Sequence, residues 1–135
     1  MKLLVRDEDD LRIVASALQD AVVRMDTLRH RPGARAFELV ASRYMHEMHD
    51  PRRTLSGLRV DGVLSAKYRG LDRDKPEAFA VLLDIAFEAT DAPGGALTLT
   101  FADGGAIRLD VEALEIAVAD VGAPRRARAV PDHGD

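Results

Sequence analysis

The sequence contains no cysteine. That absence excludes disulfide bonds, cysteine-ligated zinc and thiol nucleophiles, and it fits a protein kept in a reducing compartment. Tryptophan is also missing, and the other aromatic residues are four phenylalanines and two tyrosines. A general nucleic-acid binder usually combines a basic surface with stacking aromatics, so this scarcity and the net charge of −4 predict no nucleic-acid partner.

The chain also lacks a long apolar run. Its opening, Met1 to Val5, is largely apolar for only a few residues before the charged stretch Arg6 to Asp10. A run this short is neither the hydrophobic core of a signal peptide nor a membrane span. We therefore predict a cytoplasmic protein that has no membrane partner.

What is present is the composition of one folded domain. The 135 residues are 47% hydrophobic and 31% charged, which suits a globular chain long enough to bury a core without covalent cross-links. The last stretch carries Arg125, Arg126 and Arg128, two prolines and few apolar residues. We expect a single globular domain over residues 1–122 and a flexible tail over 123–135.

The clearest local pattern is a β-hairpin over residues 96–111. Apolar residues alternate with polar ones along both arms, so each arm has one apolar and one polar face. Matching the apolar faces predicts that Phe101 lies opposite Ile107. That register needs the three-residue loop Asp103-Gly104-Gly105, in which Gly105 takes the left-handed backbone conformation.

Changes of hydrophobic period predict the other elements. Asp7 is a plausible N-cap, and apolar residues at helical spacing predict an amphipathic helix over roughly residues 8–19. Alternation predicts strands over residues 3–5, 21–25, 35–44, 58–69 and 79–88, the last of them central in the sheet. The Asp61-Gly62 dipeptide leaves open whether 58–69 is one strand or two short ones. Residues 111–121 fit both a helix and a bulged strand, and we favour the helix.

These elements predict an α+β fold. It is mainly an antiparallel β-sheet of about six or seven strands that curls into a partial barrel, with the N-terminal amphipathic helix closing an open side. By element order alone, a pleckstrin-homology-like barrel with a C-terminal helix is the specific version we expect. The residues expected to face the core are Leu11, Val14, Leu18, Val23, Phe37, Leu39, Phe79, Val81, Leu83, Ile85, Phe87, Leu97, Leu99, Phe101, Ile107 and Leu109.

One stretch suggests metal chemistry. The candidate ligands there are His46, His49 and Asp50. The zinc-protease pattern needs two histidines four apart on one helix face, whereas these two are three apart, and Asp50 precedes Pro51, which disfavours a helix. On an extended strand the two histidines would point to opposite faces. We therefore expect no metal site in this chain.

A second cluster is basic. Arg29, Arg31 and Arg35 surround the turn His30 to Gly33 and are candidates for holding a phosphate or carboxylate. No glycine-rich anion-binding loop lies nearby, so a solvated basic turn is the competing interpretation. Elsewhere we find no nucleophile paired with a base and no phosphate loop, and we predict no catalytic residues, no cofactor-binding residues and no cofactor.

Short motifs along nearly the whole chain resemble one family. They are Asp9-Asp10-Leu11, Leu18-Gln19-Asp20-Ala21-Val22, Arg43-Tyr44, Phe87-Glu88, Ala92-Pro93, Gly105-Ala106-Ile107-Arg108-Leu109, Val111-Glu112, Asp120 with Gly122, and Pro131 with His133. On these residues the chain resembles a small alphaproteobacterial family of unknown function, domain-of-unknown-function family 2948. The resemblance implies a cytoplasmic bacterial setting and brings no activity. The chain departs from the family's aromatic pair near 44–47 and from its tryptophan after Gly122.

Two functions of different classes are compatible with the sequence. The favoured one is a non-enzymatic binding or assembly module that uses the sheet for a protein partner or for self-association. The alternative is a small-molecule-binding protein or enzyme whose site is assembled only in the folded structure. An exposed apolar patch on a flat sheet face would favour the module, and a closed pocket with converging polar groups would favour the alternative.

Overall fold

The computed structural model describes residues 2–45 and 52–126. The first elements are β1 (Lys2–Val5), α1 (Glu8–Ala17), β2 (Val22–Arg24), β3 (Arg29–Arg31), β4 (Ala36–Met45) and β5 (Arg52–Asp61). They are followed by β6 (Val63–Arg69), β7 (Phe79–Asp91), β8 (Gly94–Phe101), β9 (Ala106–Val111) and β10 (Ile116–Arg126).

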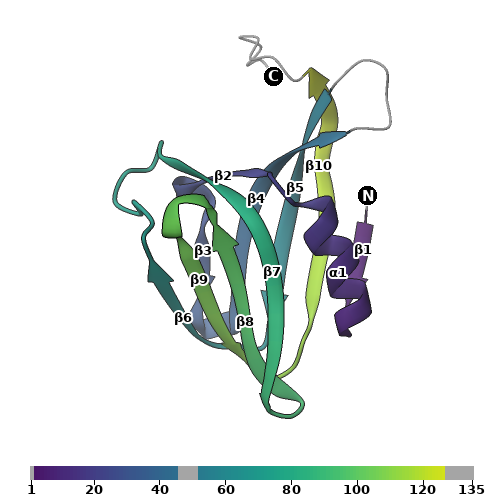
Figure 1. Cartoon of the computed structure of the whole chain (residues 1–135), viewed down its shortest axis with the longest axis vertical. Coiled ribbons are helices and arrows are strands. Elements are labelled where there is room, and N and C mark those ends of the chain that lie inside the picture. The colour runs from purple at the N-terminus through teal and green to yellow at the C-terminus, as the bar shows by residue number, and fades with distance from the viewer. Residues whose placement is uncertain (1, 46–51, 127–135) are drawn as a thin grey trace.

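The strands form one antiparallel sheet. Its order is β1-β10-β5-β4-β2-β7-β8-β9-β6, and β3 lies off this path as a partner of β4. The sheet curls without closing into a barrel, so that β4 and β5 lie behind β7 and β8 in Figure 1, with β10 to their right. The predicted α+β class, dominated by an antiparallel sheet, is confirmed.

Helix α1 lies beside the curled sheet and packs against β1 and β7 (Figure 1). The Asp7 carboxylate accepts a hydrogen bond from the backbone N–H of Asp10 at 2.8 Å, and acidic residues fill the first turn, where the helix dipole favours them. Leu11 and Val14 are buried against the core. The predicted helix is confirmed and ends at Ala17. No helix in the described ranges is long and apolar enough to cross a membrane.

The question left open at Asp61-Gly62 is resolved as two strands. Gly62 has φ +72°, a conformation that favours glycine, and it separates β5 from β6. β5 pairs with β4 and β10, whereas β6 pairs with β9 at the far end of the sheet. The corner at Gly62 therefore carries the chain from one side of the curled sheet to the other.

The core lies inside the curl. Its predicted members that are buried are Leu11, Val14, Leu18, Val23, Phe37, Leu39, Ile85, Leu97, Leu99, Phe101, Ile107 and Leu109. Val81 and Phe87 are only partly buried. Ile116 and Val118 join this core from the last strand.

Strand β7 departs from its prediction because it contains a bulge. Its pairing with β8 shifts between Leu82 and Asp84, which leaves Leu83 as the extra residue and changes the inward-facing phase. Leu82 is buried as a result. Phe79 and Leu83, both predicted to lie in the core, are instead 65% and 39% exposed.

The hairpin of β8 and β9 has the predicted faces but a different register. Leu99 lies opposite Ile107, and the backbone N–H of Phe101 donates to the carbonyl of Gly105 at 2.8 Å. The prediction that Phe101 lies opposite Ile107 is therefore wrong. The shift is two residues, and an even shift leaves every side chain on the face that alternation assigned to it.

The turn of this hairpin also differs from the prediction. It spans Ala102–Gly104, and its left-handed residues are Asp103, with φ +64°, and Gly104, with φ +84°. Gly105 is extended, with φ −75°. Aspartate and glycine both accept positive φ, so the turn forms one residue earlier than expected.

The favoured helix over residues 111–121 is wrong. β10 occupies Ile116–Arg126 and pairs with β1 on one side and β5 on the other. The alternation of Ile116 and Val118 prevails because a helix there would leave the facing edges of β1 and β5 without partners for their backbone groups. The described residues therefore have no C-terminal helix of the pleckstrin-homology-like kind. β10 continues past Gly122, where we expected the tail to begin, and residues 127–135 lie outside the described residues.

Candidate functional site

The strands β1, β10, β5 and β4 are neighbours, and the side of this part of the sheet that faces away from the core carries an apolar strip. Because Leu58 and Val118 point inward, their neighbours along the strands point outward. We call the following outward residues the outer strip: Leu4, Val40, Leu55, Gly57, Ala117, Ala119 and Val121. Leu4, Val121 and Leu55 are 62%, 51% and 38% exposed.

The middle of the outer strip is hollowed. A groove of about 310 Å³ lies over β4, β5 and β10, and Gly57, Ala117 and Ala119 are among its lining residues. Val40 and Ala119 are the two cross-strand neighbours of Gly57, so a residue without a side chain stands in the centre of this row. Large side chains at Leu55 and Val121 stand at one end of the groove, so the face has a ridge next to a hollow.

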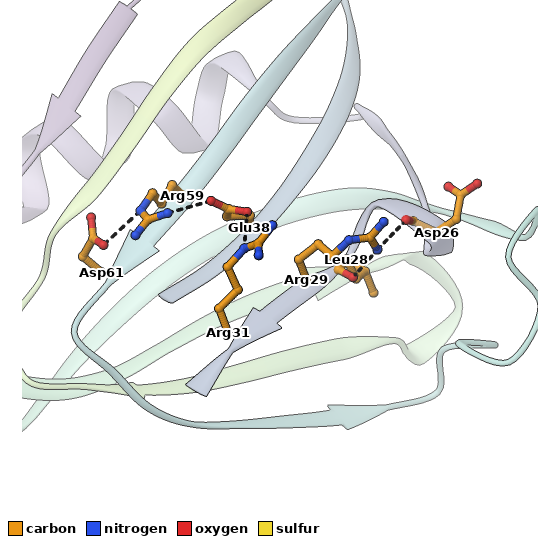
Figure 2. Close-up of polar contacts among 7 residues, drawn as sticks. All are labelled: Asp26, Leu28, Arg29, Arg31, Glu38, Arg59 and Asp61. Atoms are coloured by element: carbon orange, nitrogen blue, oxygen red, sulfur yellow. Dashed lines mark hydrogen bonds and ion pairs between the residues drawn. The ribbon is translucent and has the colours of Figure 1, made fainter. Parts of the chain in front are cut away.

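A ladder of alternating charges borders the groove at its other end. Arg59 donates from Nε to Oδ1 of Asp61 at 3.0 Å and from Nη1 to Oε2 of Glu38 at 2.7 Å. Arg31 donates from Nε to Oε1 of Glu38 at 2.9 Å (Figure 2). We call these four residues the charge ladder, and its two positive and two negative groups balance.

The ladder keeps its groups ionised. The hydrogen bond from Arg31 is the largest influence on Glu38, and together with Arg59 it lowers the pKa of that carboxyl below its ordinary value, although partial burial opposes this. The hydrogen bonds to Asp61 and then to Glu38 raise the pKa of the Arg59 guanidinium. The face therefore carries paired charges near neutral pH.

The structure places the three predicted anion-binding arginines apart. Arg31 belongs to the charge ladder. Arg29 donates to the backbone carbonyls of Asp26 and Leu28 at 2.8 and 3.1 Å (Figure 2), and Arg35 binds the carboxylate of Glu112 at 2.6 Å. Each guanidinium thus has its own acceptors, and anion binding at these residues stays a prediction.

The candidate metal ligands His46, His49 and Asp50 lie outside the described residues. Within 2–45 and 52–126, no three histidine, aspartate or glutamate side chains are grouped so that they could hold a metal ion.

Sequence reasoning did not find the outer strip because it depends on β10. A helix over 111–121 would have placed Ala119 on the opposite face from Ala117 and Val121, and it would not have joined the sheet. The signal was nevertheless available, since Ile116 and Val118 alternate with small residues over the same stretch.

Comparison with known proteins gives one family. The family model described as "Protein of unknown function (DUF2948)" matches residues 1–133. No curated protein and no solved structure matches the chain.

Proposed function

The chain belongs to this family of unknown function, and we propose that it is a non-enzymatic assembly module that pairs with a second copy of itself through the outer strip. The proposal has two parts. The first is that the protein binds a partner without catalysing a reaction, and the second is that this partner is another copy of the same chain. Its cysteine-free sequence suits the reducing cytoplasm in which we place it.

The observation that carries the proposal is the exposure of apolar side chains on one continuous sheet face. Leu4, Leu55 and Val121 come from three adjacent strands and are all more than one-third exposed. Contiguous apolar patches of this kind usually mark interaction sites, whereas single exposed apolar residues are ordinary. Two such sheet faces can stack on one another as the two layers of a β-sandwich do.

Shape and charge favour a second copy as the occupant. A two-fold axis between the ridge and the groove would place Leu55 and Val121 of each copy over the hollow at Gly57 of the other, as an isologous interface requires. The chain has a net charge of −4, so two copies repel each other at long range. The charge ladder is balanced, so its four residues add no net repulsion at the point of contact.

The test compares the oligomeric state of wild type and two variants by analytical ultracentrifugation over a range of concentrations. Wild type should form dimers, and Val121→Arg should remain monomeric because it would bury an unpaired charge at the ridge. The matched control is Leu64→Arg on β6, where the wild-type side chain is 58% exposed but lies outside the outer strip.

The control should dimerise as wild type does. A wild type that stays monomeric at the highest concentration reached would refute the proposal. So would equal dissociation of the dimer by both substitutions, because the effect would then not depend on the outer strip.

A further inference from the structure

One edge of β7 is only partly covered by the sheet. On that edge β2 pairs with residues 79–81, and the N–H of Leu82 donates to the carbonyl of Ala21 at 2.8 Å. Beyond Leu82, β7 pairs with β8 alone among the described residues. Every second residue of an antiparallel strand directs its N–H and C=O to the same side. The uncovered edge therefore presents a row of backbone donors and acceptors that a further strand can join.

Helix α1 lies beside this edge, on the side of β7 away from β8 (Figure 1). Between α1 and β7 is a cavity of about 370 Å³, which we call the helix groove. Its volume is in the range of about 300–1,000 Å³ that is typical of ligand sites. Five consecutive β7 residues, 83–87, line it, so its wall follows the edge of the strand and not one face. The other lining residues share one side of α1 and the turn after it, and they are Glu8, Leu11, Arg12, Ala15, Ser16 and Gln19.

The helix groove has an apolar floor and carboxylates at its rim. Leu11 and Ile85 are each 3% exposed, whereas Glu8 and Asp84 are exposed. Glu8 is the first residue of α1. Asp84 lies near the other end of the helix, because Leu82 is hydrogen-bonded to the segment that follows α1. A carboxylate therefore stands at each end of the groove.

The charges that line the helix groove favour a cationic partner. Glu8 and Asp84 form no salt bridge with any of the described residues. Arg12, the one cation in the lining, donates to Asp9 at 3.0 Å, so its charge is already offset. A basic group that approaches the groove is therefore attracted at both ends.

We propose that the helix groove binds an extended segment of another protein, which joins β7 as an added strand and carries a basic side chain at each end. The uncovered backbone of β7 would bond to the backbone of that segment, the source of affinity in strand addition. Alternate side chains of a strand point to opposite faces, so apolar ones can cover Leu11 and Ile85 while basic ones reach the rim.

The length of the groove sets the spacing of the basic residues. The ten residues of α1 span about 15 Å. Four residue steps of an extended strand cover about 13 Å, so two basic residues four positions apart match Glu8 and Asp84. The groove is formed by α1 and β7, which contribute nothing to the outer strip. The inference therefore goes beyond the proposed self-association and does not depend on it.

The test is an NMR titration of the full chain with a five-residue peptide of the sequence lysine, valine, threonine, valine, lysine, blocked at both ends. The matched peptide has glutamate in place of both lysines. At low salt, wild type should bind the lysine peptide at least about tenfold more tightly than the glutamate peptide. The amides of residues 83–87 that point away from β8 should exchange with solvent more slowly when the lysine peptide is bound.

Two charge reversals locate the site. Asp84→Lys should weaken binding of the lysine peptide at least about fivefold, because it replaces attraction by repulsion at one end of the groove. The control Asp74→Lys makes the same change of charge in the exposed loop between β6 and β7 and should bind as wild type does. Both side chains are exposed, so both variants should fold, and circular dichroism checks this.

Four outcomes would overturn the proposal. The first two are that the lysine peptide does not bind up to its solubility limit, or that it binds no more tightly than the glutamate peptide. The third is that both substitutions weaken binding equally, since the effect would then reflect net charge alone. The fourth is binding that leaves amide exchange at residues 83–87 unchanged, because the peptide would then not be an added strand of β7.

Discussion

The substitution Thr54→Val should stabilise the protein. The Thr54 side chain is 2% exposed and its hydroxyl has no hydrogen-bond partner among the described residues, so folding removes that hydroxyl from water without replacing the lost hydrogen bonds. A buried polar group left in this state costs about 1–3 kcal/mol. Valine has nearly the same shape, suits a β-strand and has no hydroxyl to desolvate. We expect a gain of about 1 kcal/mol or more in the free energy of unfolding.

A second hydroxyl on the same strand provides the contrast. Ser56 faces the same side as Thr54, but it donates to Asp120 at 2.8 Å and accepts from Arg43 at 3.1 Å. Ser56→Ala removes a hydrogen bond to a charged group, which is worth about 1.5–3 kcal/mol. The two substitutions each remove one buried hydroxyl from β5, and they should change stability in opposite directions.

Urea denaturation monitored by circular dichroism measures both effects. At an unchanged m-value, the midpoint should rise for Thr54→Val and fall for Ser56→Ala. In a thermal scan, a change of 1 kcal/mol corresponds to about 3–5 °C in a domain of this size. If Thr54→Val destabilises the protein as much as Ser56→Ala does, the Thr54 hydroxyl has a partner in the native state, and the reasoning from its burial is refuted.

Other predictions concern three glycines and the loss of stability at low pH. Gly95→Ala should lower the free energy of unfolding by more than about 3 kcal/mol, because a Cβ there would overlap the carbonyl oxygen of Glu88. Gly33→Ala should leave stability unchanged or raise it slightly, because no atom lies within 4 Å of the added Cβ. Urea midpoints distinguish the two variants. Gly104→Ala should lower the free energy of unfolding by about 1–2 kcal/mol, because Gly104 has a positive φ. Gly104→Asn should lower it clearly less, since asparagine tolerates that conformation. Equal losses of stability in the two variants would exclude backbone strain as the cause. The pKa of Asp120 is lowered in the folded state, so its contribution to stability is present above the unfolded pKa of about 3.9 and is lost as the pH falls through the folded pKa. Asp120→Asn should therefore be less stable than wild type at pH 7, and the difference should shrink on acidification; a difference that stays constant with pH would contradict this.

Local patterns in the sequence predicted most of the elements. The N-cap at Asp7 fixed where α1 begins, because the capping hydrogen bond and the helix dipole act within one turn. Alternation assigned the faces of β8 and β9 correctly, since side-chain direction in a strand depends only on residue parity. For the same reason the buried positions on β4, Phe37 and Leu39, were predicted correctly.

Predictions that depended on a partner strand were less successful. The bulge at Leu83 arises from the pairing of β7 with β8 and left Phe79 exposed, an outcome that the regular apolar pattern of β7 does not reveal. Side-chain parity is compatible with two registers for the hairpin of β8 and β9. The turn at Ala102–Gly104 determines which of them forms.

The tertiary structure alone decided the outer strip. Residues 111–121 suited a helix as well as a strand, and the open edges of β1 and β5 selected the strand because backbone groups in a sheet need partners. That choice produced the outer strip, and it also brought Asp120 to Ser56, 64 residues away in the sequence. Local propensity decides how each segment folds, whereas contacts between distant segments depend on which strand edges remain free, and this information is distributed over the whole chain.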